Sequence, residues 1–113
     1  MLSTIYKMKT NMDKHEIYRE CIADIEFITS LFDGGRCRDV RLARERLKNL
    51  KAKWNALVRR FKGTEIEGVI EQALTRLPSA STRPDSWHSY LYDAEGDFTF
   101  HLTHRKEVHG QES

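Results

Sequence analysis

The chain has 113 residues, of which 39% are hydrophobic, 10% aromatic and 32% charged, with a formal net charge of +2. This length allows one domain with a modest core and is too short for two, so we expect a single domain over residues 1–113. The composition excludes wholesale disorder, and no apolar run approaches the roughly 20 residues of a membrane-spanning helix. The chain also begins without the apolar block of a secretory signal, and its two cysteines are too few for a disulfide scaffold. We therefore expect a cytoplasmic protein that makes no contact with a membrane.

The first predicted element is a helix over residues 13–32. Asp13 followed by Glu16 is typical of a capping box, and Gly34 with Gly35 provides a stop. Apolar residues recur in this segment at alternating spacings of three and four, which places them on one helical stripe. The stripe contains Tyr18, Cys21, Ile25, Ile28 and Phe32.

The second predicted helix spans residues 39–62 and carries the longest unbroken pattern in the chain. Asp39 is a candidate N-cap and Gly63 a candidate C-terminal stop. Because the connection over residues 33–38 is short, we expect the first two helices to pack as an antiparallel pair. The apolar seam is Val40, Ala43, Leu47, Leu50, Trp54, Leu57 and Phe61, of which Leu47, Leu50, Trp54 and Leu57 are expected to face the first helix.

A third helix is predicted over residues 65–77, between a capping box at Thr64 and Glu67 and a stop at Pro78. The following segment, 78–86, reads PSASTRPDS, a composition typical of a linker. Three helices of this kind can enclose one core.

After the linker, residues 87–103 read WHSYLYDAEGDFTFHLT, two aromatic-rich runs around a turn, which favours a β-hairpin. With a loop at 94–96, Trp87 and Leu91 lie on the face that points away from the helices. The face expected to pack on the helices holds Tyr90, Tyr92, Phe98 and Phe100.

These elements together predict an α+β fold. It is mainly helical, with an antiparallel αα-hairpin, a third helix and a C-terminal β-hairpin. An isolated hairpin is marginal in water, so this one must dock on the helices. Residues 104–113 are polar, and we expect them to fray as a tail.

Positive charge is concentrated between Arg36 and Lys62. This segment contains eleven Lys or Arg and two acids, a net charge of +9, whereas the rest of the chain sums to −7. Acids of the first helix can pair with cations that flank the seam, for which Arg44, Arg46 and Lys53 are the candidates. The remaining outward cations have no role in folding that the sequence reveals. We predict that the binding surface comprises Arg41, Lys48, Lys51, Arg59 and Lys62, with Trp87 on the hairpin as a second anchor.

Few residues suggest catalysis or metal binding. Four histidines, His88, His101, His104 and His109, fall in the last quarter of the chain, but strand alternation would point His101 and His104 to opposite faces. Cys37 lies among arginines that could activate its thiol, yet no histidine partner is in view. We therefore expect no metal, no cofactor and no enzymatic activity.

The charge split favours a small non-enzymatic binding protein. We expect a regulator or inhibitor that docks on a larger protein or nucleoprotein complex with an acidic surface, in the manner of accessory proteins of phages and other mobile elements. The alternative is direct nucleic-acid binding through the basic helix 39–62. A protein partner is favoured over bare nucleic acid because the whole chain carries only +2 and shows no helix-turn-helix, zinc-finger or RNP-type motif.

Overall fold

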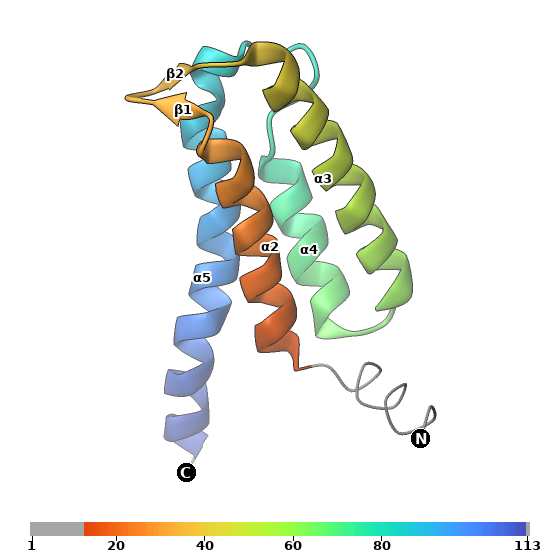
Figure 1. Cartoon of the computed structure of the whole chain (residues 1–113). Helices are drawn as coiled ribbons and strands as arrows, with labels where there is room; N and C mark the ends of the chain where they lie inside the picture. The colour runs from red at the N-terminus through yellow and green to blue at the C-terminus, as the bar shows by residue number, and fades with distance from the viewer. Residues whose placement is uncertain (1–12, 113) are drawn as a thin grey trace, which may run out of the picture.

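The computed structural model describes residues 13–112, with side chains over residues 13–103. The elements are α2 (Lys14–Thr29), β1 (Phe32–Asp33), β2 (Arg36–Cys37), α3 (Val40–Arg60), α4 (Glu65–Arg76), the 3₁₀ turn η1 (Pro84–Ser86) and α5 (Trp87–Glu112). Successive helices run in opposite directions, so the described residues form an up-and-down four-helix bundle (Figure 1). Helices α2 and α4 each pack against both α3 and α5, which closes the four into a ring.

One hydrophobic cluster fills the centre of this ring. Trp54 of α3 meets Phe98 of α5 edge to face, with ring centroids 5.2 Å apart, and Tyr18 of α2 packs on the same Phe98 at 5.8 Å. Aromatic pairs at these separations contribute beyond the area that they bury. The other fully buried large side chains include Ile17, Ile25, Ile28, Ile70, Trp87 and Leu91. The core therefore draws on all four helices of the described chain.

The central part of the expected seam of the second helix is buried, against two helices and not one, whereas Val40 at its start is 45% exposed. Ala43, Leu47, Leu50 and Trp54 are buried, and Leu57 is half-buried. Because α3 packs on α4 as well as on α2, the seam divides its contacts between them. The N-cap at Asp39 is confirmed, since its carboxylate accepts a hydrogen bond from the Leu42 amide at 3.0 Å.

The predicted capping box at the start of α4 forms only in part. Glu67 reaches back and accepts a hydrogen bond from the Gly63 amide at 2.7 Å, whereas the Thr64 hydroxyl donates to the Phe61 carbonyl and caps no amide of α4. Gly63 has a positive φ of 83°, the conformation expected of a helix-ending glycine.

The first helix ends earlier than predicted because a small ribbon follows it. α2 stops at Thr29, and β1 pairs antiparallel with β2, with Phe32 opposite Cys37. Gly34 and Gly35 lie at the tip with φ of 61° and 87°, as a two-residue turn between antiparallel strands requires. This ribbon lies at the end of the bundle where α3 and α5 begin (Figure 1).

The predicted C-terminal β-hairpin is wrong, and so is the α+β class that depended on it. Residues 87–112 form the single helix α5, and the predicted tail from residue 104 continues that helix as far as residue 112. The face assignment is also reversed: Leu91 is fully buried, whereas Tyr92 is 71% exposed. The residues of 87–103 that enter the core are Trp87, Leu91, Ala94 and Phe98, at spacings of four, three and four.

Residues 78–86, expected to be a linker, are tied to the bundle, and we call this segment the strap. Pro78 and Pro84 are buried. The indole Nε1 of Trp87 donates a hydrogen bond to the Thr82 carbonyl at 3.0 Å, which fixes the strap to the start of α5. None of the helices within residues 13–112 is long and apolar enough to cross a membrane.

Candidate binding site on helix α3

The flank of α3 that faces α2 places its cations beside acidic or aromatic groups. Lys53 Nζ donates a hydrogen bond to Asp24 Oδ1 at 3.1 Å, and Trp54 Nε1 donates to Oδ2 of the same carboxylate at 3.1 Å. The Arg46 guanidinium lies 3.7 Å from the centroid of the Phe27 ring and donates to the Phe27 carbonyl at 2.6 Å. Lys53 pairs with an acid of the first helix as predicted, whereas Arg46, for which the same pairing was predicted, contacts the ring and carbonyl of Phe27 instead.

The opposite flank of α3 faces the strap, where the cations bind neutral groups. Arg44 Nη1 donates a hydrogen bond to the Ala80 carbonyl at 2.7 Å, and Lys51 Nζ donates to the Pro78 carbonyl at 2.7 Å. Arg44 was expected to pair with an acid of the first helix, and that prediction is wrong. Burial lowers the pKa of Lys51 below its usual value, because desolvation disfavours the charged form. The carbonyls hold both side chains in place without cancelling their charge.

Further cations extend along this flank. Arg41, Lys48 and Arg59 are exposed, and within the described part of the chain they have no hydrogen bond or ion pair. Lys62 Nζ lies 3.8 Å from Glu67 Oε2, and its side chain is 80% exposed. Helical spacing places Arg41, Lys48 and Arg59 on the same side of α3 as the two that bind the strap, and Lys62 follows in the turn after the helix ends at Arg60. We call this set the cationic stripe: Arg41, Arg44, Lys48, Lys51, Arg59 and Lys62.

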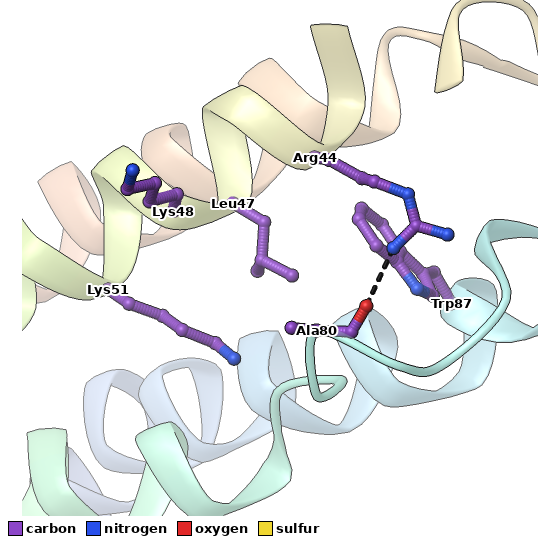
Figure 2. Close-up of a pocket in the computed structure, with 6 residues that line it drawn as sticks. All are labelled: Arg44, Leu47, Lys48, Lys51, Ala80 and Trp87. Carbon is purple, nitrogen blue, oxygen red and sulfur yellow. Dashed lines mark hydrogen bonds between the residues drawn. The ribbon is translucent and has the colours of Figure 1, made fainter. Parts of the chain in front are cut away.

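A pocket of about 300 Å³ lies between α3 and the strap (Figure 2). Figure 2 shows Arg44 and Lys51 reaching from α3 toward the strap, with Leu47 between them, while the ammonium group of Lys48 points away from the strap. The wall is mostly apolar. Six residues line the pocket: Arg44, Leu47, Lys48, Lys51, Ala80 and Trp87. The geometry combines an apolar cavity with a cationic rim.

Three of the six predicted binding residues, Lys48, Lys51 and Trp87, come together at this pocket. Trp87 reaches it as a buried helix residue and not as the exposed hairpin residue that we predicted. Lys51 also differs from the prediction, since its hydrogen bond to the strap gives it a role in the fold. The other three, Arg41, Arg59 and Lys62, lie along the stripe outside the pocket.

Sequence reasoning missed three lining residues. Arg44 could have been assigned to this side, because it lies three residues from Arg41 and four from Lys48. Leu47 was recognised only as a core residue. Nothing in the sequence of the strap indicates that Ala80 lies opposite α3, since that position depends on how the strap crosses the bundle.

The cysteines and histidines form no comparable site. Burial raises the pKa of the Cys21 thiol to about 12, which keeps it protonated at neutral pH. His101 lies 3.8 Å from Glu65 on α4, and His88 is exposed. The side chains of His104 and His109 lie outside the described residues. Among the side chains that the structure describes, no three potential ligands gather where a metal ion could bind.

Comparison of the chain with protein-family models, with curated proteins and with solved structures finds no match. The stripe and the pocket are therefore the features of the described chain that bear on its function.

Proposed function

We propose that this protein is a binding protein, and not an enzyme, that docks on an acidic surface of a larger protein through the cationic stripe of α3. A regulator or inhibitor acts in this way, by occupying a surface of its target. The observation that carries the proposal is the difference in how the cations of α3 are partnered. Arg41, Lys48 and Arg59 have no partner among the described residues, and Arg44 and Lys51 are bound only by uncharged carbonyls.

Uncompensated charge on one flank produces a directional field. A surface of one sign attracts an oppositely charged partner over a distance and raises the association rate, by about tenfold or more at low salt. Charges separated by more than about 8 Å in physiological salt are largely screened, so the effect must shrink as salt is added. Docking through the stripe should therefore show a strong salt dependence in the on-rate.

The test compares two charge-matched double variants. Arg41→Glu with Arg59→Glu reverses two exposed stripe residues that lie outside the pocket. Arg19→Glu with Arg36→Glu makes the same change in net charge at exposed positions outside both α3 and the strap. Association with immobilised polyglutamate and with a 20-base-pair DNA duplex is followed by biolayer interferometry across a salt series, with thermal unfolding as a check on the fold.

We expect the stripe variant to associate with polyglutamate about tenfold more slowly than the control variant at low salt, with the difference fading as salt rises. An equal reduction in both variants would contradict the proposal, because net charge alone would then explain the binding. If the protein instead binds the duplex more tightly than polyglutamate, and this binding weakens steeply as salt is added, the stripe is a nucleic-acid-binding surface.

A further inference from the structure

The pocket between α3 and the strap differs from the rest of the stripe, because apolar surface and cations meet there. Three apolar residues line it, Ala80 at the exposed mouth and the buried Leu47 and Trp87 beneath, and none of the six lining residues carries a negative charge. At about 300 Å³ the pocket is at the lower end of the range for ligand sites, a size that suits one large side chain and not a whole cofactor.

The cations at the rim are already positioned. Arg44 and Lys51 each use one donor on a strap carbonyl, so their orientation is fixed before any ligand arrives. A guanidinium has five N–H donors and an ammonium three, which leaves both able to bind a carboxylate as well. Pre-organised donors bind at a lower entropic cost than mobile ones.

Charge complementarity identifies the occupant. We propose that the pocket receives a large apolar side chain from an acidic peptide segment of the protein partner, while carboxylates beside that side chain pair with Arg44 and Lys51. This inference rests on the proposed function and adds the chemical pattern that the partner must present. A buried apolar anchor with flanking ion pairs is the usual arrangement of a binding hot spot.

The two tryptophans of the chain provide a built-in reporter. The indole N–H of Trp87, bonded to the Thr82 carbonyl, lies beside the pocket, whereas that of Trp54 is bonded to Asp24 on the opposite flank of α3. In a ¹H–¹⁵N correlation spectrum each indole gives its own signal. A ligand in the pocket should shift the Trp87 signal and leave the Trp54 signal in place.

The probes are three synthetic pentapeptides: Glu-Glu-Phe-Glu-Glu, Glu-Glu-Ala-Glu-Glu and Gln-Gln-Phe-Gln-Gln. The first carries both the anchor and the charges, and each of the others lacks one of the two. We expect only the first to shift the Trp87 signal at moderate concentration, and the other two to bind at least about tenfold more weakly.

Two protein variants separate the pocket from the charge of the helix. Ala80→Glu places a carboxylate in the pocket mouth but retains the backbone carbonyl that Arg44 binds. Ala56→Glu makes the same substitution at an exposed position of α3 outside the pocket. Ala80→Glu should weaken binding of the Phe peptide by about tenfold or more, and Ala56→Glu by less than about threefold. The Trp54 signal and the unfolding midpoint verify that each variant is folded.

Equal binding of the Phe and Ala peptides, or equal effects of the two variants, would overturn the pocket assignment. The proposed function would survive that result, because its own test uses Arg41 and Arg59, which do not line the pocket. A Trp87 signal that does not respond to any of the three peptides would overturn the pocket assignment as well.

Discussion

The two flanks of α3 differ in how many cations they carry and in the groups that those cations contact. On the side of α2, Lys53 meets the Asp24 carboxylate and Arg46 stacks on the Phe27 ring. On the side of the strap, Arg44 and Lys51 meet backbone carbonyls. On the side of α2 the Asp24 carboxylate cancels the charge of Lys53, whereas on the side of the strap uncharged carbonyls position the charges of Arg44 and Lys51 and leave them available.

This difference indicates which basic residues to examine for binding. A salt bridge and a carbonyl contact both fix a long side chain, but only the salt bridge cancels the charge that a partner at a distance would sense. Counting cations on a helix therefore overestimates its attraction for an acidic surface. The chemical nature of each partner group decides how much charge remains.

Among the tests of this comparison, removal of the side chain that anchors the strap should cause the largest loss of stability. Trp87 is fully buried and donates a hydrogen bond to Thr82, so Trp87→Ala should lower the free energy of unfolding by about 3–5 kcal/mol. Urea unfolding followed by circular dichroism measures the loss. A loss below about 1 kcal/mol would show that the strap does not depend on α5, and the carbonyls that position the cations would then lack support.

A smaller loss of stability should follow from a substitution on the flank of α3 that faces α2. Asp24 accepts hydrogen bonds from both Trp54 and Lys53, and Asp24→Ala leaves the buried indole without its partner. Hydrogen bonds to charged groups contribute about 1.5–3 kcal/mol, so we expect a loss in that range. Glu20→Ala is the control, since Glu20 lies 3.9 Å from Lys53 and is exposed, and it should change stability by less than about 0.5 kcal/mol.

The smallest change in stability is expected for Lys51, whose ammonium group is partly desolvated against the strap. Its pKa in the folded protein lies below its ordinary value, so between the folded and unfolded pKa values the unfolded chain binds more protons. The contribution of Lys51 to the free energy of unfolding must therefore rise with pH between those two pKa values. Lys51→Met should change stability by less than about 1 kcal/mol at pH 7 and should lack this rise. Unfolding of both proteins from pH 7 to 10.5 checks the sign, and a wild-type advantage that shrinks with pH would contradict it.

The helices up to residue 76 could be predicted because their apolar spacing, caps and stops agree. In α3 the central seam residues Ala43, Leu47, Leu50 and Trp54 are buried, and Asp39 caps the helix. These signals are contained within each segment, because spacings of three and four residues place the apolar side chains on one face of a helix. The end of α2 was set too late because the pairing of Phe32 with Cys37 competes with the last turn of the helix.

The C-terminal segment was misassigned because two local signals conflicted. Tyr90, Tyr92 and Phe100 have high β propensity, and Gly96 resembles a turn residue, whereas the spacing of Trp87, Leu91 and Phe98 is helical. Packing against α2 and α4 favours the helical period. A methyl group added at Gly96 would meet nothing within 4 Å, so the glycine lies on the open side of α5 and requires no turn. The pocket could not be predicted either, since it depends on where the strap crosses α3.

The closed ring of helices has a consequence for how the chain folds as it is synthesised. α3 packs on its neighbours in sequence, α2 and α4, and α4 packs on α5, so most helix contacts are local. Chains dominated by local contacts typically fold in microseconds to milliseconds. The contact between α2 and α5 is the exception, because these helices are the first and last of the described bundle. Until α5 leaves the ribosome, the apolar face of α2 around Tyr18 cannot pack against it. Packing of α2 on α5 is therefore the last step in folding of the bundle.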